Sequence, residues 1–294
     1  MIKKKRLFTL TDWIIGSITL LMAIFFVYRL SVGLNYNWAW SKIPQFLFRY
    51  DVTKGEWVSN ILMNGFYVTL RLSIWGIILA AFFGVLMGIC RSVKIHFFRW
   101  TAITYVETMR NLPPLVIIFI MYFFIGDQIL APMDLSYHVE GLSSGTQSVI
   151  AFLFAEAAYL PAFISALLTL AIFEGAYITE IVRAGIASVD KGQWDASHAL
   201  GMTWYQQMRH IILPQTFQRI MPPLAGQVIS LIKDSSIVSI ISIQELTFQG
   251  TELMQGTMHT IEIWTVVTLM YLTLTLPCSL LVEQIERYMA KSDY

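Results

Sequence analysis

Six long apolar segments alternate with polar connectors along the chain. A helix that crosses the hydrocarbon core of a bilayer needs about 20 mostly apolar residues. By this measure the expected spans lie at approximately 11–34, 60–90, 101–126, 161–187, 217–245 and 260–285. A polar, aromatic-rich connector covers residues 35–57, and a second long connector covers residues 127–160. The pattern predicts an all-α integral membrane protein with about six transmembrane helices.

Two details of this pattern qualify the prediction. The basic residues Lys3, Lys4, Lys5 and Arg6 precede the first apolar run, which is longer than a signal-peptide core and lacks a small-x-small cleavage site. We therefore expect a retained anchor helix. The second connector contains a short apolar piece, residues 149–154, which we expect to pack at the outer surface or to fold back.

The distribution of basic residues predicts the orientation. Cytoplasmic loops carry an excess of Lys and Arg. With the N-terminus inside, the cytoplasmic side receives the N-terminal cluster together with Arg91, Lys94, Arg99, Lys191, Arg209, Arg219, Arg287 and Lys291. The connectors at 127–160 and 246–259 contain neither Lys nor Arg. Both termini and the loop at 190–214 are thus expected in the cytoplasm.

Composition supports a membrane protein and excludes several functions. Hydrophobic residues make up 56% of the chain and charged residues only 13%, against about 25% in soluble domains. The net charge of +1 gives no indication of a nucleic-acid partner. The sequence contains no phosphate-binding G-x-x-x-x-G-K-[ST] loop, no H-E-x-x-H and no G-x-S-x-G motif. We therefore expect neither catalytic residues, nor a metal site, nor a cofactor bound by this chain.

Residues 190–214 form a polar island between two apolar segments. Asp190 can cap a helix N-terminus, and Gly201 suits the left-handed residue that ends one. A short helix with a small and apolar face is predicted by Trp194, Ala196–Ser197, Ala199–Leu200 and Trp204, and Pro214 is expected to make the backbone restart. Such a helix can lie on lipid or receive another protein.

Ionisable residues at membrane depth are costly and are therefore functional candidates. Glu180 and Arg183 are three residues apart and can pair on one helix face, either as a self-neutralising pair or as part of a substrate path or partner contact. Glu174 lies deeper and faces differently. Lys233 and Asp234, which we expect near the middle of the fifth segment, point about 100° apart, so each needs its own partner.

The polar residues beside these charges leave two functions open. Lys233, Asp234, Ser235 and Ser236 form either an interhelical clamp or part of an amino-acid passage. Arg110 and Asn111 precede Pro113 and Pro114, which interrupt the third segment; this break suits a carboxylate site or a hinge. The candidate substrate path comprises Arg110, Asn111, Glu174, Tyr177, Glu180, Lys233, Asp234, Ser235 and Ser236.

Several ordered motifs resemble those of ABC importer permeases, in particular the polar amino-acid branch. Asp195-Ala196-Ser197, Gly201, Ile211 and Leu213-Pro214 are similar to the cytoplasmic loop signature of this family, which begins Glu-Ala-Ala, so this chain departs from it by Asp and Ser. The segments ETMRNLPPLV (107–116), GAYITEIVRAGI (175–186) and KDSS (233–236) also match.

The resemblance implies a five-helix core of the type I importer class at residues 57–294, preceded by one additional helix and connector at 1–56. It implies a bacterial inner-membrane subunit that works with a second permease, identical or paralogous, two cytoplasmic ATPase subunits that bind ATP and Mg, and an external solute-binding protein. Under this resemblance the ATPase-coupling residues are Asp190, Gly192, Trp194, Asp195, Ala196, Ser197, Ala199, Leu200, Gly201, Leu213 and Pro214. The alternatives are an ion-coupled secondary transporter, with Glu174 or Asp234 as the coupling carboxylate, and an integral membrane enzyme.

Overall fold

The structure, a computed structural model, describes residues 9–33, 36, 38–53, 55–93 and 95–292. The chain divides into two compact units, Met1–Trp40 and Ser41–Tyr294, so residues 41–56 belong to the second unit together with the core. The basic residues used to orient the chain at Lys3, Lys4, Lys5, Arg6 and Lys94 lie outside the described residues, as does the side chain of Lys291.

The described part of the chain is almost entirely helical. In order, its elements are α1 (Leu10–Gly33), η1 (Trp40–Lys42), α2 (Ile43–Leu47), β1 (Phe48–Asp51), β2 (Glu56–Ser59), α3 (Ile61–Ser92), α4 (His96–Asn111), α5 (Pro114–Phe123), η2 (Phe124–Leu130), η3 (Ala131–Met133), α6 (Leu135–Glu140), α7 (Ser144–Leu153), η4 (Ala157–Tyr159), α8 (Leu160–Ala187), α9 (Lys191–Ala199), α10 (Trp204–Gln207), η5 (Met208–Ile212), α11 (Leu213–Asp234), η6 (Ser235–Ile241), α12 (Leu246–Thr257) and α13 (Thr260–Ser292). Elements η2 and η5 are π-helical turns and the other η elements are 3-10 turns.

The expectation of six membrane-length helices is confirmed. The stretches long and apolar enough to cross a bilayer are Leu10–Arg29, Ile61–Ser92, Pro114–Met133, Ala157–Ala187, Trp204–Ile241 and Thr260–Gln284. The first of them, in α1, exposes its apolar side chains along its described length, which suits a helix surrounded by lipid. The fold is therefore that of an all-α integral membrane protein.

Helices α3 and α8 form the centre of the second unit. Their backbones approach closely at Gly84 and Gly88, where a Cβ on Gly88 would lie only 2.7 Å from the Cβ of Val182. Small residues at such a spacing let helices pack closely in membranes. Helix α8 belongs to the most buried of the candidate spans, Ala157–Ala187, in which 56% of the residues in the apolar stretch are buried inside the protein. It therefore positions the polar residues described below.

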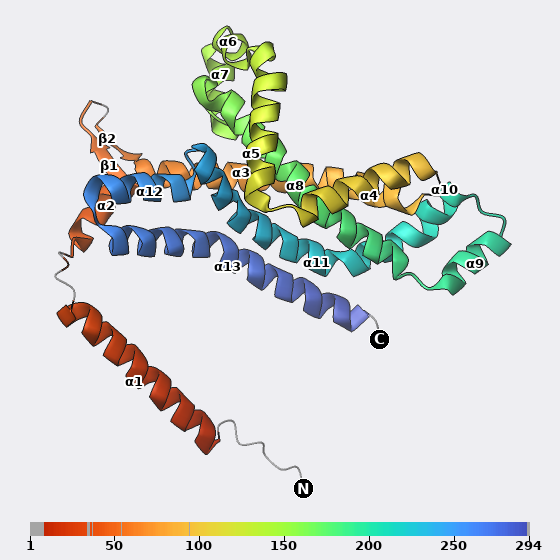
Figure 1. Cartoon of the computed structure of the whole chain (residues 1–294), viewed down its shortest axis with the longest axis horizontal. Coiled ribbons are helices and arrows are strands. Elements are labelled where there is room, and N and C mark those ends of the chain that lie inside the picture. The colour runs from red at the N-terminus through yellow and green to blue at the C-terminus, as the bar shows by residue number, and fades with distance from the viewer. Residues whose placement is uncertain (1–8, 34–35, 37, 54, 94, 293–294) are drawn as a thin grey trace. The chain divides into compact units, whose positions relative to one another are not determined.

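The third expected span, 101–126, is wrong in its boundaries. The chain forms two helices here, because α4 ends at Asn111 and α5 begins at Pro114. Pro113 lacks an N–H, so its neighbours cannot continue the helical ladder, and α5 turns sharply away from α4 (Figure 1). The proline pair thus redirects the chain, as the hinge interpretation expected.

The fifth expected span, 217–245, is also displaced. Helical structure runs without interruption from α10 through η5 and α11 to η6, so Pro214 does not restart the backbone. Leu213 instead donates its N–H to Met208 five residues back, and this π-helical turn accommodates the proline that follows. Trp204 begins α10 and is not part of α9.

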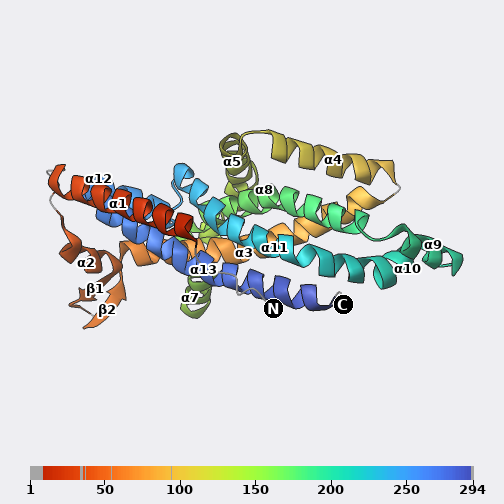
Figure 2. The same cartoon turned by 90° about the horizontal axis from the view of Figure 1, so that it is seen from below.

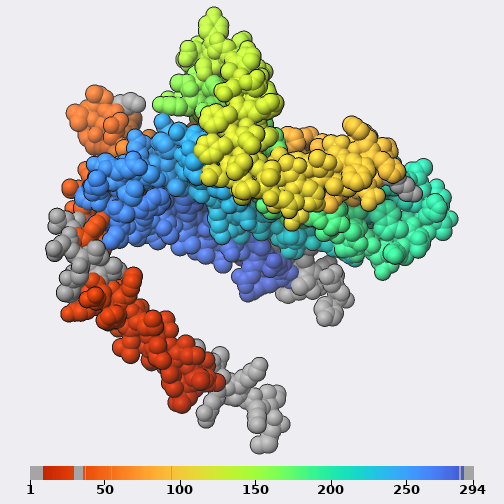
Figure 3. Space-filling model, in the orientation of Figure 1, coloured from red at the N-terminus to blue at the C-terminus, as the bar shows by residue number. Residues whose placement is uncertain are grey.

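The second unit has two distinct ends. Helices α9 and α10 lie at one end, which we call the α9 end, and α2, the β1–β2 hairpin and α12 lie at the other, the α12 end (Figures 1 and 2). Helices α5, α6 and α7 project from the side of the bundle (Figure 3). The chain after α7 folds back onto α3, where Phe154 stacks on Trp75 with ring centroids 5.0 Å apart.

Candidate functional site: the α9 helix and a central polar cavity

Helix α9 is defined at both ends by its own residues. At the N-terminus, Oδ1 of Asp190 accepts the N–H of Gly192 at 2.6 Å. At the C-terminus, Gly201 adopts φ +74°, its N–H bonds the carbonyl of His198, and the N–H of Met202 bonds that of Ser197. This left-handed closure satisfies carbonyls that would otherwise be free. The expected helix and both of its caps are confirmed.

One side of α9 anchors it to the bundle. Trp194 packs with Trp204 against a cluster that includes Met208 and Ile212, and Ser197 is buried. Gln215 at the start of α11 also donates a hydrogen bond to Gln193 at 3.3 Å. These contacts connect α9 to the start of α11.

The opposite side of α9 is not covered by any of the residues that the structure describes. Asp195, Ala196, Ala199 and Leu200 are all exposed, and the side chain of Leu200 is 79% exposed. Leu213 and Pro214 of the expected coupling set lie apart from this face, in the first turn of α11. The exposed residues combine small side chains with one large apolar side chain, which suits a contact with another protein.

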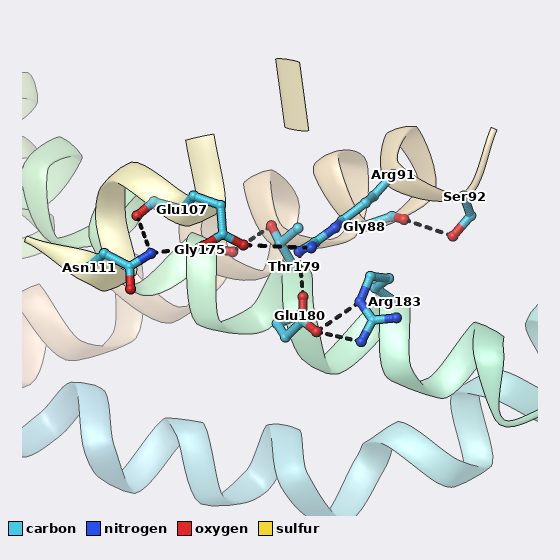
Figure 4. A network of polar contacts seen from close by, with 9 residues as sticks. All are labelled: Gly88, Arg91, Ser92, Glu107, Asn111, Gly175, Thr179, Glu180 and Arg183. Carbon is cyan, nitrogen blue, oxygen red and sulfur yellow. Dashed lines mark hydrogen bonds and ion pairs between the residues drawn. The ribbon is translucent and has the colours of Figure 1, made fainter. Parts of the chain in front are cut away.

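A polar network near the α9 end joins three helices (Figure 4). Arg91 of α3 contacts Oε2 of Glu180 on α8 at 2.5 Å, and Arg183 contacts Oε1 of the same carboxylate at 2.5 Å. Arg91 also approaches Glu107 of α4, 3.8 Å away, and Asn111 donates to Glu107 at 2.8 Å. The expected Glu180–Arg183 pair is confirmed, and Glu180 and Asn111 both take part in this network.

A second polar cluster surrounds a cavity of about 200 Å³ in the middle of the second unit. Its lining residues come from α5, α8, α11 and η6 and are Pro114, Phe173, Tyr177, Gln227, Ser230, Asp234 and Ile237. The Arg110 guanidinium lies over the Tyr177 ring, 5.6 Å from its centroid. Tyr177 and Asp234, both predicted path residues, thus face one cavity, and Arg110 stands behind Tyr177.

Glu174 lies fully buried beside this cavity. Its Oε2 accepts a hydrogen bond from Gln227, while its Oε1 has no partner among the described residues. Asp234 is near enough to interact electrostatically with Glu174. The carboxyl groups of Glu174 and Asp234 and the amide of Gln227 therefore lie close together between α8 and α11.

The four residues of the KDSS segment (233–236) lie in different surroundings. Helix α11 ends at Asp234, so the four residues lie at a change from α to 3-10 geometry and not in mid-helix. Lys233 is exposed, Ser236 is half-buried, and Ser235 is buried with its hydroxyl donating to the carbonyl of Ile232. Of the four, Asp234 lines the central cavity.

Sequence reasoning missed three functional candidates. Gln227 and Ser230 precede Asp234 by seven and four residues, which is the spacing of one helix face. That polar stripe in an otherwise apolar segment could have identified them. Arg91 lies 89 residues from Glu180 in the sequence, and no local pattern connects the two.

A buried carboxylate outside the spans was also missed. Glu245 caps α12 by accepting the N–H groups of Thr247 and Phe248, and it accepts the Tyr271 hydroxyl at 2.8 Å. Burial raises the pKa of Glu245 to about 7, because these hydrogen bonds compensate only partly for the lost hydration.

Comparisons with known proteins identify the class. Residues 76–291 match the family described as binding-protein-dependent transport system inner membrane component. The chain is 32% identical over 233 residues to a probable glutamine ABC transporter permease protein, GlnM, of Bacillus subtilis, covering 79% of this chain and 95% of the relative. It is 30% identical over 254 residues to the glutamate/aspartate import permease protein GltJ of Escherichia coli, covering 86% and 96%.

Solved structures agree with this assignment. The fold matches the crystal structure of an amino acid ABC transporter with histidines at a TM-score of 0.64 and 26% identity, covering 86% of this chain and all of that one. The inward-facing methionine transporter MetNI shares the fold at a TM-score of 0.55 and 17% identity. The chain belongs to the family of binding-protein-dependent transport system inner membrane components, and is thus a multi-pass permease subunit.

Proposed function

We propose that this chain is a permease subunit of an ATP-driven importer of polar amino acids, and that α9 is the helix through which a cytoplasmic ATPase acts on it. The relatives named above carry glutamine or glutamate and aspartate in their names, which supports the substrate class. Membership in a permease family disfavours the ion-coupled secondary transporter. The exposed face of α9, capped at both ends, carries the proposal of coupling.

The mechanism follows from how α9 is attached. In this proposal the ATPase subunits would hold ATP and Mg²⁺ and would supply the ATP-driven closure, and the permease chain supplies the mechanical linkage. Force on α9 reaches α11 through the Trp194–Trp204 contacts and the Gln193–Gln215 bond. Helix α11 carries Gln227 and Asp234 at the central cavity, so its displacement changes the groups that a solute meets there. The Arg91–Glu180 contact makes α3 and α8 move together.

The proposal also includes an orientation of the chain in the membrane and two further partner proteins. The distribution of Lys and Arg supports a cytoplasmic position for the α9 end and for both termini. Helix α13 runs from the α12 end toward the α9 end, which supports a cytoplasmic C-terminus (Figure 1). A second permease, identical or paralogous, completes the path, and a solute-binding protein delivers the amino acid to the α12 end.

Co-purification of the tagged permease with its ATPase tests this proposal. Ala196→Trp places a large side chain on the exposed face of α9 and is expected to abolish recovery of the ATPase. Ser148→Trp, at an exposed position of α7, is the matched control and is expected to leave recovery unchanged. Equal recovery with both variants would contradict coupling through α9.

A further inference from the structure

A larger cavity lies away from the central one, between α3, the returning connector and the segment after η6. It measures about 450 Å³, within the range of small-molecule sites, which is roughly 300–1,000 Å³. Asn64, Tyr67 and Arg71 line it from α3, Glu156 and Tyr159 from the connector, and Gln244 from the segment before α12. It shares no lining residue with the central cavity.

The guanidinium group of Arg71 lines this cavity, and one of its N–H groups makes a hydrogen bond that the structure describes. It lies in a membrane-length helix and is half-buried, and Nη1 donates to the carbonyl of Phe154 at 3.2 Å. Among the described ion pairs none involves Arg71. A guanidinium has five donors in a planar fork that matches a carboxylate, and a charge at this depth requires a counter-charge. Arg71 therefore favours an anionic group in the cavity.

Glu156 presents the opposite charge to the same cavity. Its carboxylate is exposed and acts electrostatically on Arg71, yet the two are not within ion-pair distance. The connector does not need this pair for attachment, because Trp75 bonds the carbonyl of Leu153 at 2.9 Å and stacks on Phe154. One positive and one negative group thus face a common space without neutralising each other.

We propose that this cavity binds a free amino acid as a zwitterion, with its α-carboxylate on Arg71 and its α-ammonium on Glu156. The amides of Asn64 and Gln244 offer donors and acceptors to a polar side chain. The inference rests on the proposed import of amino acids. In the proposed orientation the cavity lies toward the outer side, so it receives the solute before the central cavity does. The long connector then has a function, since it supplies the anionic wall.

Equilibrium binding of L-glutamine to the complete importer tests the site. The complex is held in nanodiscs without ATP and without the solute-binding protein. Two analogues each lack one charge: glutamine α-amide lacks the carboxylate and N-acetylglutamine lacks the ammonium. Arg71→Gln is expected to weaken glutamine binding about tenfold or more and to leave α-amide binding unchanged. Glu156→Gln is expected to weaken glutamine and α-amide binding and to leave N-acetylglutamine binding unchanged.

Two exposed residues outside this cavity provide matched controls. Arg49→Gln and Glu140→Gln remove the same charges elsewhere and are expected to leave glutamine affinity unaltered. Wild-type affinity in Glu156→Gln would overturn the proposal, as would loss of binding only in Asp234→Asn. Glu156 is exposed, so Glu156→Gln is expected to fold and assemble normally. It therefore tests the proposed binding site even if Arg71→Gln does not assemble. These variants are expected to leave the co-purification of the ATPase unchanged. The coupling proposal and the binding proposal are therefore tested by two different measurements.

Discussion

Gln227 of α11 donates a hydrogen bond to the fully buried carboxyl group of Glu174 on α8. The contact joins the central helix of the fold to the helix that begins beside α9. The second oxygen of Glu174 has no partner among the described residues and can accept a hydrogen bond from a group that enters the neighbouring cavity. This side-chain pair thus holds α8 and α11 together beside the central cavity.

Gln227→Leu is expected to destabilise the protein by about 1–3 kcal/mol, because it leaves a buried carboxyl group without a donor. The matched control is Gln218→Leu, which removes the same amide from an exposed position of α11 and should change stability little. Thermal unfolding in nanodiscs measures both. Equal Tm values for the two variants would show that the Glu174 contact does not hold α8 and α11 together.

The Arg91–Glu180 contact is expected to contribute more to stability than the Arg183–Glu180 contact. Both contacts measure 2.5 Å, but the Arg91 side chain is 16% exposed and the Arg183 side chain 37%, so solvent screens the second contact more strongly. Double-mutant cycles with Glu180→Gln should give coupling energies of about 1 kcal/mol for Arg91 and about half of that for Arg183. The reverse order would contradict the assigned role of Arg91 as the link between α3 and α8.

The apolar pattern predicted the number of spans because each bilayer crossing leaves a long apolar segment in the sequence. It ran the third span across Pro113 and began the fifth span after Pro214, and the structure differs from it at both positions. The same residue type produced a sharp turn at the first position and a continuous helix at the second, where the π-helical turn accommodated it. Which of the two occurs depends on the packing around each proline, which a single sequence does not contain.

The candidate site was predictable only where its signals were local. Asp190 and Gly201 cap α9 through contacts within three residues, and both were identified. Arg91 and Glu180 meet across two helices, and the cavity at Asp234 depends on α5, α8 and α11 together. Such contacts follow from tertiary packing, so the sequence identified Glu180 and Asp234 as charges in need of partners but did not identify the partners.

Stability is expected to fall as pH rises from about 4.5 to about 7 because of Glu245. Its pKa is raised in the folded state to about 7 from an ordinary value of 4.5, so the folded protein keeps a proton in this window that the unfolded chain has released. Glu245→Gln removes the titrating group and should flatten this part of the profile. Tm measured from pH 4.5 to 8 gives both curves.

The control for this experiment is Glu252→Gln, at an exposed position of the same helix. It is expected to keep the slope of the unaltered protein. A slope that persists in Glu245→Gln would assign the pH dependence to another group.

Cysteine cross-linking along α9 tests the central claim most directly. Ala196→Cys and Ala199→Cys place thiols on the exposed face, and Ser148→Cys places one on α7. With the ATPase present in membranes and a thiol-to-amine cross-linking reagent added, the two α9 variants should form a cross-linked species that contains both proteins, and the α7 variant should not. Absence of that species from both α9 variants, or equal amounts in all three, would contradict the conclusion that α9 receives the ATPase.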